Sequence, residues 1–202
     1  IKQGLNLPIT GSPSEYVVDG ARVSRVAVVA DDFPNMKPRM HVAVGDKVVR
    51  GQLLFEDRKA EGVRFTSPAE GEIVAVHRGE RRVLQSVVIA VSEKDQQGQG
   101  EQVTFEGHVG SSVSDYSRDT LKALLSESGL WTAFRARPYD RVPAPSEDCS
   151  SIFVTAMDTN PLAGSVPKAL EGREDDFKRG LEGLSLLTDG AVHLCKAPGA
   201  AI

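Results

Sequence analysis

The sequence predicts an α+β protein of two domains, in which a β-rich barrel or sandwich precedes an α/β domain. Residues 41–76 form short β-rich runs separated by glycine-containing turns, a pattern typical of small closed barrels and sandwiches. Residues 151–195 read as strand, loop, helix and strand, which predicts a βαβ unit with two parallel strands. A polar, glycine-bearing run at residues 92–101 separates these parts. We therefore predict a β-rich domain with an N-terminal arm at residues 1–100 and an α/β domain at residues 101–202.

Composition and charge narrow the class of protein. Of the 202 residues, 40% are hydrophobic and 26% are charged, as in ordinary globular proteins. The formal net charge is −4 and no basic stripe appears, so we do not expect a nucleic-acid partner. No apolar run approaches the ~18 residues of a membrane-spanning helix, so association with a membrane would require partner subunits. The chain starts at Ile1 without methionine and stops at Ile202 just after an apparent strand, and we expect it to be part of a longer protein.

The residues that usually carry metal or catalytic chemistry are scattered. Cys149 and Cys195 lie far apart and the four histidines form no cluster, so the sequence predicts neither a disulfide framework nor a metal site. No nucleophile, base and orienting group are spaced for covalent catalysis, and no carboxylate pair has an assignable acid–base role. We therefore assign no catalytic residue to this chain.

In the first domain we expect an irregular arm at residues 1–11, a buried strand at residues 24–30, and a closing buried strand at residues 83–91. The loop at residues 31–40 contains two prolines and three large apolar side chains, Phe33, Met36 and Met40. These side chains are costly to expose. They either pack under the loop, which we favour, or face a ligand or partner.

In the second domain we expect helices at residues 120–127 and at residues 174–187. The segment Ser117-Arg118-Asp119 caps the first of them, with Asp119 able to accept from the free N–H groups of the first turn. The loop after the strand at residues 151–156 carries Asp158, Thr159 and Asn160. Ligands of open α/β sheets bind beyond the carboxyl ends of strands, which makes these three residues a candidate ligand loop. The loop lacks a G-x-G-x-x-G or Walker pattern. Since Asp and Asn also favour turns, a purely structural role has equal weight.

The stretch at residues 41–76 resembles the lipoyl and biotinyl carrier domains. The matching features are the Val44-Gly45-Asp46 turn, the Gly51-Gln52 pair, and the run Ser67-Pro68-Ala69-Glu70-Gly71. The resemblance implies a barrel-sandwich hybrid with Lys59, at the tip of the intervening hairpin, as the site of a prosthetic group. Arg58 precedes this lysine and the return to Ser67 is one residue longer than in carriers, so we favour an ordinary solvated tip.

The chain as a whole resembles the NqrA family of the sodium-translocating NADH:quinone oxidoreductases. The matching blocks are residues 1–9, 40–57, 82–89, 128–133 and 153–163. The resemblance implies a peripheral subunit on the cytoplasmic face of a bacterial inner-membrane complex, docked on its membrane subunits. That complex passes electrons from NADH, through FMN, FAD and iron–sulfur centres expected on partner subunits, to ubiquinone and pumps Na⁺. The family is associated with the quinone-reducing end.

The family is similar in fold to the flavin-binding and NADH-binding component of respiratory complex I, and to the C component of the Rnf complex. This similarity implies a Rossmann-like second domain. In the complex I component, a glycine-rich stretch after Ser-Gly-Leu binds flavin and nucleotide. Here Ser128-Gly129-Leu130 is followed by bulky residues from Trp131 onward, and backbone could not approach a phosphate closely there. We therefore expect a chain without its own redox cofactor; the alternative is an Rnf-type electron-transport protein that binds FMN and NADH.

A quinone requires an apolar, aromatic slot with a few hydrogen-bond donors. Two stretches, residues 33–40 and 131–139, supply such side chains best. The predicted quinone-binding residues are Phe33, Met36, Met40, Trp131, Phe134, Arg135, Arg137 and Tyr139. Loop packing or contacts with other subunits would explain the same residues equally well.

Overall fold

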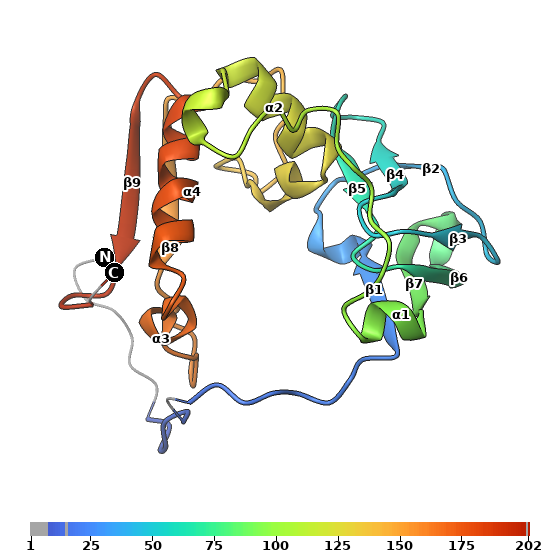
Figure 1. The fold of residues 1–202 in the computed structure, drawn as a ribbon, viewed down its shortest axis with the longest axis horizontal. Coiled ribbons are helices and arrows are strands. Elements are labelled where there is room, and N and C mark those ends of the chain that lie inside the picture. The colour runs from blue at the N-terminus through green and yellow to red at the C-terminus, as the bar shows by residue number, and fades with distance from the viewer. Residues whose placement is uncertain (1–7, 15, 201) are drawn as a thin grey trace. The chain divides into compact units, whose positions relative to one another are not determined.

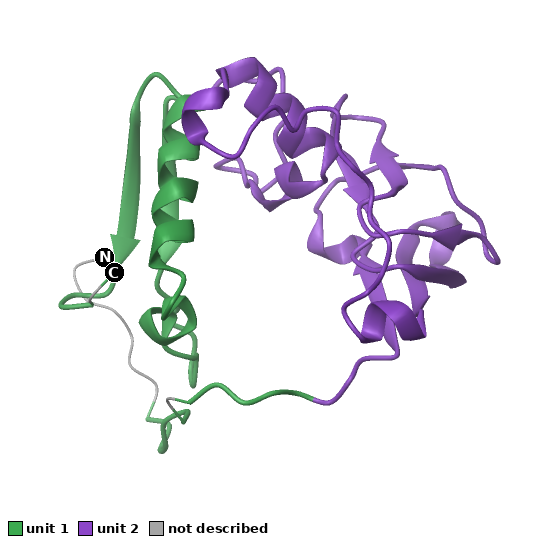
Figure 2. Ribbon diagram, viewed as in Figure 1, with its two compact units in different colours: residues 1–20, 149–202 green, residues 21–148 purple. Residues whose placement is uncertain are grey.

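The computed structural model describes residues 8–14, 16–200 and 202. The chain splits into two compact units, residues 21–148 and residues 1–20 with 149–202 (Figure 2). Of the predicted N-terminal arm, residues 1–7 lie outside the described part, and residues 8–11 form neither helix nor strand.

The unit at residues 21–148 is built around two antiparallel sheets (Figure 1). One sheet has the strand order β1-β7-β6-β3 and the other has the order β2-β4-β5. The strands are β1 (Arg25–Val29), β2 (Pro38–Met40), β3 (Lys47–Val48), β4 (Leu53–Asp57), β5 (Arg64–Thr66), β6 (Gly71–Arg78) and β7 (Leu84–Val91). The largest fully buried side chains are Phe55, Leu54, Ile73, Leu84, Ile89, Val48, Val63 and Val87. This arrangement agrees with the barrel-sandwich expected for residues 41–76.

One strand differs from its prediction. The apolar run at residues 24–30 is not a fully buried strand, because β1 lies at the edge of its sheet and, among the described strands, pairs with β7 alone. Its residues alternate between exposed and half-buried, and Val29 is 40% exposed. A continuous β-branched run therefore identified a strand correctly but overestimated its burial.

The segment at residues 92–148 packs on the barrel within the same unit. It contains α1 (Glu93–Gln96), the 3₁₀ turn η3 (Val113–Asp115), α2 (Arg118–Glu127) and the 3₁₀ turn η4 (Leu130–Ala133). Arg50 pairs with the buried carboxylate of Asp95, and the Arg50 N–H donates to the Glu101 carbonyl oxygen at 3.1 Å. The polar run at residues 92–101 is thus tied to the barrel. The domain boundary after residue 100 remains a prediction.

Helix α2 begins two residues earlier than expected. Its N-cap is Ser117, whose hydroxyl accepts from the Thr120 N–H, and Asp119 lies in the first turn. The predicted capping segment 117–119 therefore contains the cap, but the prediction that Asp119 supplies the accepting side chain is wrong. Ser117 meets the geometric requirement of a cap, since its backbone is extended while its side chain reaches the free N–H of the first turn.

The other unit contains a βαβ arrangement (Figure 1). Its elements are β8 (Ser151–Ala156), α3 (Val166–Leu170), α4 (Glu174–Leu186) and β9 (Ala191–Lys196). Strands β8 and β9 pair in parallel, with Ser151 opposite Ala191 and Ala156 opposite Lys196. The predicted parallel pair with a helical crossover is confirmed, and the chain combines a β-rich part with an α/β part. Among the described residues, every helix is too short or too polar to span a bilayer.

Candidate functional site

The structure brings the two predicted quinone-binding stretches together in the barrel unit. The Arg135 guanidinium lies over the Phe33 ring, with its carbon 5.3 Å from the ring centroid. The same guanidinium donates to the backbone carbonyl of Asp32 at 3.0 Å and to that of Phe134 at 2.9 Å. A cation over an aromatic face is attractive. Arg135 therefore connects residues 32–33, which follow β1, with residues 134–135, which follow η4.

Three phenylalanines form the apolar base of this region. Phe65 on β5 stacks on Phe55 of β4, with ring centroids 4.6 Å apart and planes at 16°. Phe33 meets Phe65 edge-on, with centroids 4.7 Å apart and planes at 77°. Phe55 and Phe65 are buried, whereas Phe33 is half-buried. Edge-on and stacked pairs of this kind stabilise beyond the area that they bury.

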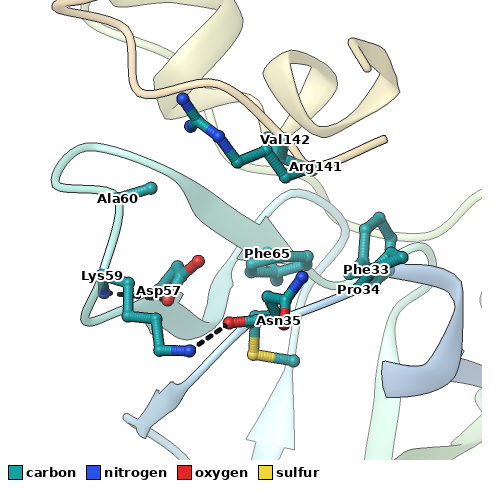
Figure 3. Close-up of a pocket in the computed structure, with 10 residues that line it drawn as sticks. Phe33, Pro34, Asn35, Asp57, Lys59, Ala60, Phe65, Arg141 and Val142 are labelled. Atoms are coloured by element: carbon teal, nitrogen blue, oxygen red, sulfur yellow. Dashed lines mark hydrogen bonds between the residues drawn. The ribbon is translucent and has the colours of Figure 1, made fainter. Parts of the chain in front are cut away.

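The hairpin between β4 and β5 holds the loop at residues 33–37 through polar contacts. The Asp57 carboxylate accepts from the Lys37 and Lys59 backbone N–H groups at 3.0 and 2.9 Å. The Lys59 ammonium reaches across to the Asn35 carbonyl oxygen at 2.9 Å (Figure 3). Asn35 has φ +65°, a left-handed conformation that asparagine tolerates better than most residues. This bond uses one of the three N–H donors of the Lys59 ammonium, so the group can also donate to a ligand.

A pocket of about 260 Å³ opens between these loops (Figure 3). Its lining residues are Phe33, Pro34, Asn35, Met36, Asp57, Lys59, Ala60, Phe65, Arg141 and Val142. The lining combines an aromatic base with carbonyl, carboxylate and cationic groups at the edge. Such a combination suits a small, flat ligand that presents hydrogen-bond acceptors.

Arg141 contributes a second cation to the lining. Its guanidinium forms a two-pronged ion pair with Glu147, with N–O distances of 2.8 and 2.7 Å. This hydrogen bonding raises the pKa of Arg141 above its usual value. The same Arg141 hydrogen bond is the main cause that lowers the pKa of Glu147. Glu147 therefore stays ionised at neutral pH and keeps Arg141 oriented.

The other residues predicted for quinone binding lie elsewhere in the unit. Trp131 is buried, donates from Nε1 to the Pro143 carbonyl oxygen at 2.8 Å, and meets Phe134 edge-on. Met40 lies on β2, paired with Phe55. Arg137 forms an ion pair with Asp140 at 3.4 Å on the surface, and Tyr139 is 77% exposed. Of the eight predicted residues, Phe33 and Met36 line the pocket and Arg135 supports it; the role of all eight remains a prediction.

The candidate ligand loop lies in the other unit, directly after β8. The Asp158 carboxylate accepts from the backbone N–H of Asn160 at 2.9 Å and from its side-chain amide at 2.7 Å. Asp158, Thr159 and Asn160 are all exposed. This is the turn geometry that Asx residues adopt, and a ligand-binding role for the loop remains a prediction.

Of the ten lining residues, only Phe33 and Met36 were among the predicted quinone-binding residues. The residues missed include the polar and aromatic groups of Asp57, Lys59, Phe65 and Arg141. Lys59 was singled out only as a carrier-like attachment site, and the structure instead shows its ammonium bonded to the Asn35 carbonyl oxygen. The charged residues at the tip of the hairpin between β4 and β5 were the one feature of the sequence that could have pointed to Asp57 and Lys59 as ligand contacts. Arg141 has no local signal, because it lies about eighty residues from the hairpin that it faces. Within the described part of the chain, no three His, Cys, Asp or Glu residues gather in a metal-binding arrangement.

Comparison with known proteins gives matches in both parts of the chain. Residues 1–92 match the NqrA N-terminal barrel-sandwich hybrid domain, and residues 116–202 match the NqrA second alpha/beta domain. The chain is 48% identical to the A component of the Na⁺-translocating NADH-quinone reductase of Vibrio anguillarum over 197 residues, which is 98% of this chain. It is 48% identical over 200 residues to the same component from Neisseria meningitidis serogroup B, and 47% identical over 197 residues to that from Vibrio parahaemolyticus.

The chain spans 43% of the length of each of these curated relatives. The two domain matches follow one another in the order in which the family names them, and the structure contains both the barrel and the α/β part. The chain therefore belongs to the NqrA family, whose relatives are named as the A component of the Na⁺-translocating NADH-quinone reductase.

Proposed function

We propose that this chain is part of the NqrA component of a Na⁺-translocating NADH:quinone reductase, and that its pocket receives the head group of ubiquinone. The observation that carries the proposal is the meeting of the Phe33 loop, the Lys59 hairpin and Arg141 around one aromatic-based pocket. Membership of the NqrA family supports the assignment to the complex.

The chemistry of the lining supports a quinone in particular. A benzoquinone ring is flat and apolar on its faces, and its two carbonyl oxygens accept hydrogen bonds. The half-buried Phe33 offers an aromatic ring, the buried Phe65 forms the apolar base beneath it, and the Lys59 ammonium offers N–H donors at the edge. At about 260 Å³ the pocket is just smaller than the ~300–1,000 Å³ of drug-sized ligand sites, so it suits the head group rather than the isoprenoid tail.

In this proposal the chain carries no redox cofactor of its own and serves a complex whose flavins and iron–sulfur centres lie on partner subunits. The bulky residues after Ser128-Gly129-Leu130 support this part, since Trp131 and Phe134, whose rings meet edge-on, stand in place of the glycines that close approach of backbone to a phosphate requires. Sodium transport and quinone reduction then belong to the assembled complex. We place the chain at the cytoplasmic face of the membrane, held by membrane subunits.

A ligand titration of the full-length protein tests the proposal. We would record its absorbance for bound flavin, then add a short-chain ubiquinone while following tryptophan fluorescence. Trp131 is bonded to Pro143, next to the pocket residue Val142, so bound quinone should quench it. The variant Trp131→Phe identifies that part of the signal. Saturable quenching that disappears in the variant supports the proposal.

Other ligands distinguish the alternatives. Bound flavin, or a response to FMN or NADH, would favour the Rnf-type electron-transport protein. An intact mass increased by a lipoyl or biotinyl group on Lys59 would favour a carrier module. The absence of any quinone response, with the protein folded, would contradict a head-group site in this chain.

A further inference from the structure

The hairpin between β6 and β7 is a short, strongly cationic segment. Residues 77–83 read His77-Arg78-Gly79-Glu80-Arg81-Arg82-Val83, with three arginines against one glutamate, in a chain whose net charge is −4. The tip is closed by backbone hydrogen bonds, among them Gly79 N–H to the Val83 carbonyl oxygen at 2.8 Å. Figure 1 shows the two strands that carry it.

The arginine side chains at the tip are exposed. No ion pair among the described residues involves Arg78, Arg81 or Arg82. Arg78 donates to the carbonyl oxygen of Arg82 at 3.1 Å, which uses one of its five N–H groups. Val83 is 61% exposed, although the next residue, Leu84, is buried. The tip therefore presents unneutralised guanidinium groups beside one apolar side chain.

The backbone at the tip disfavours arginine. Arg81 has φ +52° and Arg82 has φ +61°, so two consecutive non-glycine residues adopt the left-handed conformation. Glycine adopts this conformation without steric cost, and asparagine tolerates it better than arginine. The Val83 N–H donates to the Glu80 carbonyl oxygen at 3.1 Å, so the two arginines occupy the central positions of a tight hairpin turn, which requires positive φ and usually holds Asn or Gly.

We propose that the β6–β7 tip, residues 77–83, binds the anionic head groups of a phospholipid bilayer. Guanidinium groups pair with phosphate in two-pronged fashion, and an exposed apolar side chain next to cations suits the boundary between head groups and acyl chains. An acidic protein segment would also attract the arginines. Such a segment would also need an apolar side chain placed to cover Val83, whereas a bilayer surface offers phosphate groups and acyl chains together.

Vesicle binding by the full-length protein tests the proposal. We would co-sediment it with vesicles of phosphatidylglycerol and phosphatidylcholine, and with vesicles of phosphatidylcholine alone, in about 0.05 M and about 0.5 M salt. Wild type should bind the anionic vesicles at low salt only. Since each arginine near such a surface changes binding about fivefold, Arg81→Gln/Arg82→Gln should lower the partition constant about 25-fold.

The matched control is Arg22→Gln/Arg25→Gln, which removes the same charge from another exposed pair. Arg25 pairs with Ala90, six residues along β7 from Leu84, and so lies about 20 Å from the tip. This control should change binding less than twofold. Arg81→Gly/Arg82→Gly should lose binding like the glutamine variant and melt at a higher temperature, because it relieves the left-handed strain.

Three results would overturn the proposal. One is equal binding to both kinds of vesicle. Another is an equal loss of binding in the control pair, which would mean that only net charge matters. The third is binding to polyglutamate, lost in Arg81→Gln/Arg82→Gln, without binding to anionic vesicles; that outcome would assign the tip to an acidic protein partner.

Discussion

The contact between Gly129 and the barrel can be tested by adding a single methyl group. Gly129 follows α2 with φ +79°, and a Cβ at this position would lie 2.5 Å from Thr66 Oγ1 and 3.2 Å from Thr66 Cγ2. The Thr66 hydroxyl also donates to the Ser128 carbonyl oxygen at 2.9 Å. Gly129→Ala therefore combines left-handed strain with displacement of a hydrogen-bonded side chain.

The expected cost is the sum of these two effects. Left-handed strain in alanine costs about 1 kcal/mol, and the lost hydrogen bond with local overpacking adds about 2 kcal/mol. We expect Gly129→Ala to lower the free energy of unfolding by about 3 kcal/mol. Gly98 is the matched control, since its φ is +75° and nothing lies within 4 Å of its added Cβ. Gly98→Ala should cost about 1 kcal/mol.

Urea denaturation followed by Trp131 fluorescence measures both variants, because Trp131 is buried two residues beyond Gly129. A double-mutant cycle with Thr66→Ala isolates the contact, and the combined variant should lose less than the sum of the two single losses. Equal costs for Gly129→Ala and Gly98→Ala, or additive costs in the cycle, would refute the packing of Gly129 against Thr66.

Three further predictions concern polar contacts. Asp95→Ala should lower the free energy of unfolding, measured in urea, by about 2 kcal/mol. This is less than for a fully buried pair, because solvent screens the half-exposed Arg50 side chain. The lowered pKa of Glu147 means that its pair with Arg141 stabilises the fold above the unfolded pKa, and that this contribution is lost as pH falls through the folded pKa. Thermal melts should therefore show a smaller loss of stability on acidification below about pH 4.5 in Glu147→Gln than in wild type. Ser117→Ala should cost about 1 kcal/mol in urea through the lost N-cap of α2, and an unchanged midpoint would contradict that cap.

The barrel and the βαβ unit could be predicted from the sequence because both depend on local patterns of residues. Alternating apolar residues and glycine turns specify short antiparallel strands, and the 3.6-residue period at residues 174–187 specifies α4. Burial was less predictable. The run that forms β1 has the composition of a central strand, but it lies at a sheet edge, and edge position depends on topology rather than on composition.

The candidate pocket was predictable only in part. Phe33 and Met36 stood out as apolar side chains in a proline-rich loop, and Arg135 as a donor near aromatic residues. Trp131 stood out for the same reason; its Nε1 donates to the Pro143 carbonyl oxygen, and it is not among the lining residues. Arg141 joins the lining through long-range packing, and no local pattern shows which distant loops a fold will bring together.

If the quinone head group binds in the pocket that Lys59 lines, replacing Lys59 should raise the dissociation constant of the quinone. We would compare the dissociation constant of a short-chain ubiquinone for the full-length wild type, Lys59→Met, and Lys47→Met. Lys47 is an exposed lysine on β3 outside the pocket and serves as the matched control. A hydrogen bond from a charged donor contributes about 1.5–3 kcal/mol, so Lys59→Met should weaken binding at least tenfold while Lys47→Met leaves it unchanged. Equal dissociation constants for all three proteins would contradict a quinone site at Lys59.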